Sequence, residues 1–389
     1  MKIKFFQLLF PLLLLVLSAC VKEFRPSIST YEDLLVVDGM ITDAPGPYTI
    51  TLSKTSPIKE FSPIKPYSNC TVEIKDDQGN QEILTEVAAG VYKTDSLTGL
   101  QGIVGRKYKC TILTPGGERY ESEEQLIKKD AGIKSVYAEV EHHADPKFFY
   151  GRNGYQFFVD IEKPLTDSAC FLWQLECTYK FNVDTLIYYY YEGGGVIKPF
   201  SNHDSLLTCY RTEPIKKIYV LNTTSQSEEL LTRFPLNYED NYSEALRIRY
   251  SLNVTQLTIN RSAYTYWNSL KKIMENQGEL YAQQPYQVKS NVINVRNPDK
   301  PALGFFMAAG LSEKRVFVDK IGPPYFYDTN CGKPVPPFDG DLLSELLITE
   351  PADWPIYLFG LVSDAATYDQ KCIDCRKKGI LKKPDFWVE

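Results

Sequence analysis

Histidine, methionine and tryptophan are scarce in this sequence, and several familiar motifs are missing. Its 389 residues include only 3 His, 4 Met and 4 Trp. There is no GxSxG nucleophile elbow, no HExxH zinc motif, no Walker loop and no dinucleotide fingerprint. The formal net charge of −6 has the wrong sign for a protein that binds the phosphates of nucleic acids. We therefore expect no nucleic-acid partner, and the sequence predicts no catalytic residue, metal ion or cofactor.

A long apolar run is also missing. The run from Phe5 to Leu17 has about 13 residues, whereas roughly 20 are needed to span a bilayer. It follows Lys2 and Lys4 and ends in Ser18, Ala19 and Cys20, which is the order of a secretory signal closed by a lipobox. We predict that residues 1–19 are a signal peptide, that cleavage falls between Ala19 and Cys20, and that the Cys20 thiol is lipidated.

The predicted lipid determines the compartment. Removing residues 1–19 takes away two basic residues and no acidic one, so the net charge falls from −6 to −8. Two or three acyl chains give stable anchoring, so membrane lipid is an expected partner of the N-terminus. The residues after Cys20, Val21 to Glu23, resemble a short signal that sends Bacteroidota lipoproteins to the cell surface. We expect an outer-membrane lipoprotein that is exposed at the surface, with residues 20–33 as a lipidated linker.

Aromatic and β-branched residues predict a mainly β chain. There are 27 Tyr and 20 Phe, and such residues favour strands. Short strands between Gly, Pro and Asn turns predict an N-terminal immunoglobulin-like β-sandwich over residues 34–128. A larger β-sandwich-like domain is expected over 132–389. Within it, one face of a strand should hold Phe171, Trp173, Leu175 and Cys177, and an inserted α-helix is expected at about 262–277, capped by Asn260 or Ser262 and ended by Gly278.

Eight cysteines remain once Cys20 is lipidated. An even number in an oxidising compartment favours disulfides, although the sequence does not fix their connectivity. Alternation places Cys70 and Cys110 in the same core, either bonded to each other or as two free thiols. Structural disulfides are favoured over metal or redox chemistry for Cys372 and Cys375, with Cys331 as a possible further member. The candidate disulfide cysteines are Cys70, Cys110, Cys170, Cys177, Cys209, Cys331, Cys372 and Cys375.

Four consecutive tyrosines, Tyr188, Tyr189, Tyr190 and Tyr191, form the candidate partner surface. A strand puts about half of them outside the core, and exposed tyrosines make good contact surface. The alternative is that a neighbouring loop covers the outward pair. The glycines at 193–195 more simply form a hairpin tip than a nucleotide loop, and core packing is the simpler role for Trp354. His142 and His143 should point in opposite directions on an extended chain, which disfavours a metal site.

The chain resembles the domain of unknown function 4249 family of Bacteroidota lipoproteins. The resemblance rests on LLVVDGMITDAPGPYTITLSKT at 34–55, YWNSLKKIMENQGELY at 266–281, VKSNVINV at 288–295, LGFFMAA at 303–309 and CIDCRKKGILKKPDFW at 372–387. It implies a secreted lipoprotein, often encoded beside TonB-dependent receptors, and it supplies no catalytic residues.

Three interpretations of function stay open at this point. The first is a non-enzymatic accessory or ligand-capture subunit of a TonB-dependent nutrient uptake system, with a glycan or a peptide as the ligand. The alternative is a structural or adhesive lipoprotein of the cell envelope. An unrecognised glycosidase is a third, lesser reading, because carboxylate pairs cannot be located without a structure. Fold class alone does not decide among these readings.

Overall fold

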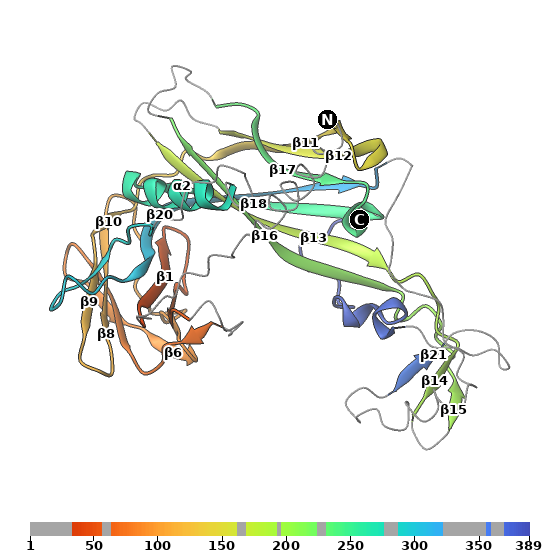
Figure 1. Cartoon of the computed structure of the whole chain (residues 1–389), viewed down its shortest axis with the longest axis horizontal. Helices are drawn as coiled ribbons and strands as arrows, with labels where there is room; N and C mark the ends of the chain where they lie inside the picture. Colours follow the sequence, from red (N-terminus) through yellow and green to blue (C-terminus); the bar gives the residue numbers. More distant parts are fainter. Residues whose placement is uncertain are drawn as a thin grey trace, which may run out of the picture.

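The structure is a computed structural model that describes residues 33–56, 64–161, 169–192, 196–223, 231–275, 287–321, 355–358 and 369–389. The predicted signal peptide, Cys20, the linker up to residue 32, Cys331 and Trp354 lie outside the described residues. The predicted mainly β class with one α-helix is confirmed (Figure 1). In the described part, no helix is long and apolar enough to cross a membrane.

The N-terminal part is a β-sandwich with one core. Alternate residues of its strands, such as Ile50 and Leu52 in one sheet and Val72 and Ile74 in the other, are fully buried between the two sheets. The first sheet contains β1 (Leu35–Thr42), β2 (Thr49–Lys54), β3 (Lys65–Pro66), β6 (Thr85–Ala88) and β7 (Val91–Lys93). The second contains β4 (Thr71–Asp76), β5 (Gln81–Ile83), β8 (Lys107–Leu113), β9 (Arg119–Ser122), β10 (Gln125–Leu126) and β19 (Val292–Asn294).

The C-terminal part packs two further sheets against each other. Four long strands continue the first sheet: β16 (Thr208–Asn222), β13 (Cys170–Asn182), β18 (Arg249–Ile259) and β20 (Leu303–Asp319). The sheet that covers one face of them contains β11 (Ile133–Asp145), β12 (Phe148–Ile161) and β17 (Phe234–Asp240). The predicted shared face of β13 is confirmed, because Phe171, Trp173, Leu175 and Cys177 all lie in this core.

Strand β20 belongs to both parts. It runs parallel to β1 over residues 303–309 and antiparallel to β18 over 310–319. Its even-numbered Phe306 and Ala308 lie in the N-terminal core, and Val316 and Val318 pack against the C-terminal core. Between them, a Cβ on Gly310 would lie 2.3 Å from the Lys128 carbonyl oxygen. The backbone of residues 128–130 therefore crosses β20 at Gly310. These residues fall at the predicted boundary between the two domains, and that boundary stays a prediction.

The helix α2 (Arg261–Glu275) covers the opposite face of the four long strands. Ala263 is buried in an apolar cluster with Leu172, Leu257 and Phe305, and Trp267 packs against it. The side chain of Asn260 donates to the Gln125 side chain and the Leu126 carbonyl, so it ties the start of the helix to the sandwich. Gly278, the predicted end of the helix, lies outside the described residues.

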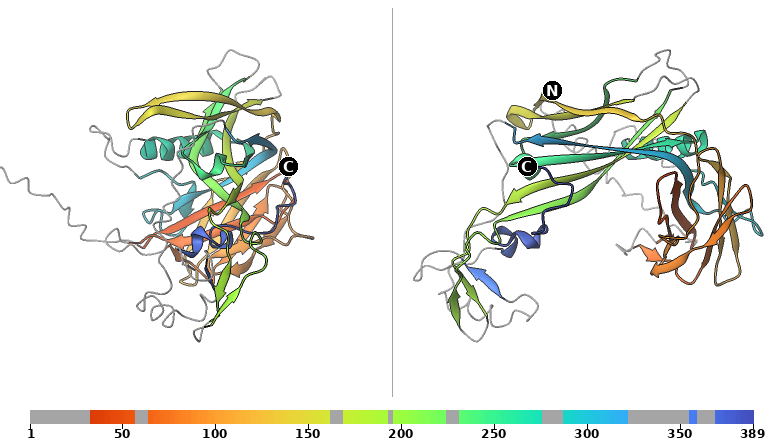
Figure 2. Two further views of the ribbon diagram at one scale, coloured as in Figure 1. Left: turned by 90° about the vertical axis from the view of Figure 1, so that its right-hand side faces the viewer. Right: turned by 180° about the vertical axis from the view of Figure 1, so that it is seen from behind.

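A small sheet stands at the far end of the molecule from the sandwich (Figures 1 and 2). It contains β14 (Tyr189–Tyr191), β15 (Ile197–Pro199) and β21 (Ile356–Leu358). Three short 3₁₀-helices complete the described elements: η1 (Glu244–Leu246), η3 (Gln370–Cys372) and η4 (Cys375–Lys377). The two ends are joined by the four long strands, which give the molecule its elongated shape.

The cysteine predictions need correction. Cys70, Cys110, Cys170 and Cys177 are free thiols. Register explains why Cys70 does not reach Cys110. Cys110 pairs with Ile74, and Cys70, which directly precedes β4, is four residues or about 13 Å of strand away from Ile74, far beyond disulfide range. Cys170 and Cys177 face opposite cores of the sheet. Burial raises the pKa of the Cys177 thiol to about 11, so this thiol is inert.

The C-terminal cysteines are bonded. Cys209 in β16 and Cys375 in η4 form a disulfide across 166 residues of sequence, and Cys372 is disulfide-bonded as well. The two cysteines of the C-terminal CxxC are therefore not joined to each other. The Cys209 bridge fixes the C-terminal segment to the edge strand of the long sheet.

Candidate functional site

Two rows of polar side chains cross the face of the long sheet that carries α2. Strand register aligns them as Gln174, Thr255 and Glu313 in the first row and Glu176, Asn253 and Arg315 in the second. We call these the polar rows. Neighbouring strands lie about 4.8 Å apart and successive residues on one face about 7 Å apart, so the rows cover roughly 10 Å by 7 Å. They interrupt an otherwise covered face.

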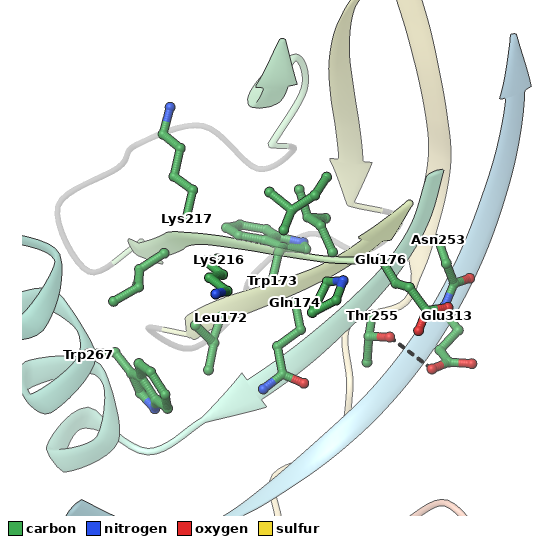
Figure 3. Close-up of a pocket in the computed structure, with 14 residues that line it drawn as sticks. Leu172, Trp173, Gln174, Glu176, Lys216, Lys217, Asn253, Thr255, Trp267 and Glu313 are labelled. Carbon is green, nitrogen blue, oxygen red and sulfur yellow. Dashed lines mark hydrogen bonds between the residues drawn. The ribbon is translucent and has the colours of Figure 1, made fainter. Parts of the chain in front are cut away.

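On one side of the polar rows, the sheet is apolar and lies under α2. The next row toward the sandwich holds Leu172, Leu257 and Leu311, aligned by the same register. Leu172 and Leu257 are buried beneath the helix, together with Val220. Trp267 stands at the border between this apolar cluster and the polar rows (Figure 3).

On the other side, the C-terminal segment 369–389 crosses the sheet. The disulfide anchors it at Cys375, and Ile380 exchanges two backbone hydrogen bonds of 2.9 Å with Tyr210. The buried ring of Trp387 packs edge-on against Tyr210 and Phe317, at 5.1 Å and 5.4 Å between centroids. The segment therefore closes this end of the face as α2 closes the other.

An open groove of about 530 Å³ lies beside the polar rows. The edge strand β16 bulges there, because Trp173 pairs with Tyr219 and Leu175 with Ile215. Three residues of β16, from Lys216 to Ile218, thus oppose the single residue Gln174, and such a bulge bends the strand. Figure 3 shows Gln174 and Lys216 on the same side as Trp267, while Lys217 points to the other side. We call this the sheet groove.

Hydrogen bonds hold several groups of the polar rows in place. The Thr255 hydroxyl donates to the Glu313 carboxylate at 2.8 Å, and an Arg315 Nη donates to the Ser251 hydroxyl at 3.0 Å. The guanidinium of Arg315 lies 3.8 Å from the Glu176 carboxylate and stacks 3.6 Å from the centroid of the Phe386 ring. Burial lowers the pKa of Arg315 from its usual value, and the two carboxylates partly offset this effect.

A second polar network lies on the opposite, inner face of the long sheet, behind the sheet groove. Buried Trp173 donates its indole N–H to the Gln256 side chain at 3.0 Å. The Asp130 carboxylate, on the segment that crosses β20, accepts from the Thr258 hydroxyl at 2.7 Å and from the Gln256 amide at 3.3 Å. These bonds link the crossing segment to β18, so the site stands on a fixed framework.

The four tyrosines of the candidate partner surface are mostly covered. Tyr191 is fully buried, and Tyr189 packs beside it against β21. On the other face of the small sheet, Tyr190 packs near Phe200. Tyr188 is 38% exposed and its ring lies 4.6 Å from that of His203. This packing is similar to the alternative in which neighbouring segments cover the outward tyrosines. A partner role for the tyrosines stays a prediction.

His142 and His143 differ in their surroundings, as two adjacent residues of a strand should. His142 Nδ1 lies 2.8 Å from the Asn153 side-chain oxygen, whereas His143 stacks on Tyr238 with the ring centroids 3.9 Å apart. Among the described residues, no group of three or more His, Cys, Asp or Glu side chains is placed to hold a metal ion.

Sequence reasoning missed the sheet groove. Its groups come from four strands and a helix that are far apart in sequence, and only strand register brings them together. A signal existed in β13, where exposed Gln174 and Glu176 alternate with buried Trp173, Leu175 and Cys177. That alternation marks one wet face but does not locate its neighbours.

These features define a class: a mainly β protein whose two sandwiches share a strand and whose long sheet carries an open polar groove. The chain belongs to the family described as domain of unknown function (DUF4249), whose model matches residues 21–315. No curated protein matches it. Among solved structures, the collagen binding domain of the Erysipelothrix rhusiopathiae surface protein RspB aligns at 10% identity over 75% of this chain and 97% of that chain. Its TM-score of 0.08 carries no argument.

Proposed function

We propose that this protein is a lipid-anchored, surface-exposed outer-membrane protein that captures a ligand for a TonB-dependent receptor without acting as an enzyme. The observation that carries the capture role is the sheet groove, an open polar face framed by α2 and by the C-terminal segment. Sites of this kind, concave with a few convergent polar groups, are the default binding hypothesis for an uncharacterised protein.

The anchoring part of the proposal rests on the sequence. The basic start, the apolar run and the Leu17 to Cys20 lipobox support lipidation at Cys20. The resemblance to Bacteroidota lipoproteins, often encoded beside TonB-dependent receptors, supports the outer membrane and a receptor partner. A lipid-anchored protein beside such a receptor raises the local concentration of whatever it binds.

The chemistry of the sheet groove supports binding rather than catalysis. Glycoside hydrolysis needs one carboxylic acid that stays protonated, and enzymes achieve this by placing it in an apolar, poorly solvated setting. The Glu176 side chain is 48% exposed and lies beside the Arg315 cation. The Glu313 carboxylate accepts a hydrogen bond from Thr255. Both surroundings suit carboxylates that accept hydrogen bonds from a ligand.

Affinity purification tests the proposal. The tagged full-length protein is recovered from detergent-solubilised outer membranes and its partners are identified by mass spectrometry. One TonB-dependent receptor in near-stoichiometric amount is the expected result. Recovery of the protein alone would contradict the accessory role and favour the alternative of a free-standing structural or adhesive lipoprotein.

A Cys20→Ala variant is the matched control. It should lose the lipid, leave the membrane fraction and fail to recover the receptor, because the anchor is what holds the two proteins in one membrane. A variant that stays in the membrane fraction would show that Cys20 is not the anchor.

A further inference from the structure

We propose that the sheet groove binds an uncharged oligosaccharide through the side chains of the polar rows. This inference deepens the capture role proposed above and rests on it. The chemical class of the ligand follows from the side chains that the sheet presents and from the backbone groups that are already paired within it.

Most backbone groups in the floor of the groove are already paired. Strands β13 and β18 are each paired on both sides, apart from Gln174 opposite the bulge of β16. An extended peptide that binds as an added strand needs an unpaired strand edge, and the edge strand β16 forms a border of the groove and not its floor. A ligand on the floor is therefore recognised mainly by side-chain tips, which disfavours a peptide there.

The side-chain tips match hydroxyl groups. Gln174 and Asn253 are amides that both donate and accept, the carboxylates of Glu176 and Glu313 accept, and the Thr255 hydroxyl, which donates to Glu313, can still accept. A sugar hydroxyl also donates and accepts, and neighbouring hydroxyls on one ring can bond two acceptors of the same row. The described polar rows hold more acceptors than free donors, because the Arg315 guanidinium is already shared among Glu176, Ser251 and Phe386.

Charge argues for a ligand without net charge. The polar rows contain two carboxylates and one guanidinium, and Lys216 adds a second cation at the bulge. The charges of the site therefore balance internally. An acidic glycan would bring its negative charge close to Glu176 and Glu313, and the repulsion and the cost of desolvating those carboxylates would oppose binding even with Lys216 at the border.

The size and the borders of the groove favour several sugar rings rather than one. The rows cover roughly 10 Å by 7 Å of sheet, and the groove is open along its length between α2 and the C-terminal segment. Trp267 borders one end (Figure 3). Aromatic side chains at the ends of a polar surface offer apolar area to the C–H faces of sugar rings.

Binding to short oligosaccharides tests the inference. The mature protein, purified in detergent, is screened against a panel of uncharged and acidic oligosaccharides and of peptides, and hits are measured by isothermal titration calorimetry. We expect an uncharged oligosaccharide to bind. A Gln174→Ala/Glu313→Gln double variant should weaken that binding at least about tenfold, the size expected for removing two hydrogen bonds, one of them to a charged group.

Lys217→Ala is the matched control. Lys217 belongs to the same bulge, but it points to the other side of the sheet (Figure 3), where its ammonium lies 5.4 Å from the centroid of the Tyr219 ring. The affinity of the Lys217→Ala variant for the oligosaccharide should be unchanged. Circular dichroism confirms folding of each variant, and the single variant Gln174→Ala, at an exposed position, serves where the double variant does not fold.

The outcomes separate this inference from the accessory role. Binding of acidic glycans or peptides only, no binding at all, or equal affinity in the double variant and the wild type would overturn the oligosaccharide inference even if a receptor co-purifies. Oligosaccharide binding that depends on Gln174 and Glu313, without any co-purifying receptor, would support the inference and contradict the accessory role.

Discussion

Successive residues of β13 point to opposite faces of its sheet, and the two faces meet different surroundings. Odd-numbered residues such as Trp173 and Leu175 enter a continuous core against β11, β12 and β17. Even-numbered residues pass from Leu172 under α2, through the open pair Gln174 and Glu176, to the end closed by the C-terminal segment. The inner face therefore stabilises the fold, so the side chains of the outer face can differ in chemistry without loss of the core. Four measurements test this difference between the faces.

The largest effect is expected for Trp173→Ala on the inner face. Trp173 is 1% exposed and its ring stacks 4.4 Å from that of Phe234, so its removal leaves a cavity and should cost about 3–5 kcal/mol of unfolding free energy. Urea unfolding measures this loss. Gln174→Ala, one residue away on the other face, should stay within about 0.5 kcal/mol of wild type. Equal losses of unfolding free energy in the two variants would contradict the conclusion that the inner face stabilises the fold more than the outer face does.

The second effect concerns the closure of the outer face. A Cys209→Ala/Cys375→Ala variant loses the disulfide that ties the C-terminal segment to β16, and we expect a loss of about 2–4 kcal/mol because a long loop is released in the unfolded chain. Urea unfolding under non-reducing conditions measures it, with the free thiol variant Cys70→Ala as the control. An unchanged midpoint would show that the other contacts of the segment secure it: the Cys372 disulfide, the hydrogen bonds between Tyr210 and Ile380, and the packing of Trp387.

The third effect tests the place where residues 128–130 cross the inner face of β20, at Gly310. A Cβ at residue 310 would lie 2.3 Å from the Lys128 carbonyl oxygen and 2.7 Å from the Asp130 nitrogen. Gly310→Ala should therefore cost about 1–3 kcal/mol through forced backbone movement. Gly116→Ala is the control, since its nearest neighbour is 3.8 Å away. Thermal unfolding of the two variants compares them, and similar midpoints would mean that the crossing segment yields easily.

The smallest effect is a pH dependence of the inner face. Burial raises the pKa of the Glu239 carboxyl above its usual 4.5, although a hydrogen bond from Ser243 opposes this. The folded protein then holds the proton more tightly than the unfolded chain, so this group's stabilising contribution is present below about pH 4.5 and is lost as pH rises through the raised pKa. Glu239→Gln should remove that decline.

Urea unfolding over a pH series measures this dependence as the difference between variant and wild type. Gln174→Ala, which carries no titratable group, should give a curve parallel to that of the wild type. Parallel curves for Glu239→Gln as well would show that the Glu239 carboxyl titrates alike in the folded and unfolded chains.

Alternation in the sequence predicted much of this fold, because burial of one strand face is a local property. The shared face of Phe171, Trp173, Leu175 and Cys177 and the helix near 262–277 are both confirmed. Parity also put Cys110 in the sandwich core, yet it could not give the distance to Cys70, since that depends on the pairing of β4 with β8. The register of distant strands is a global property.

The same limit hid the candidate site and the shared strand. LGFFMAA at 303–309 reads as one buried strand, but nothing within it identifies β1 as its parallel partner. Likewise, Gln174, Thr255 and Glu313 become neighbours only when β13, β18 and β20 align. The remaining part of the polar face depends on where a bulge in β16 falls, and the Pro and Lys residues of 214–217 hint at an edge strand without fixing that position.

The parallel pairing of β1 with β20 has a consequence for the order of folding. Val36 finds its partner at Leu303, so the first described strand to be synthesised waits for one of the last. Until then β1 is an unpaired strand edge, which favours aggregation with other chains. A chain cut before residue 303 should share this defect. The order of synthesis thus delays completion of the sandwich until residues 303–309 are available to pair with β1.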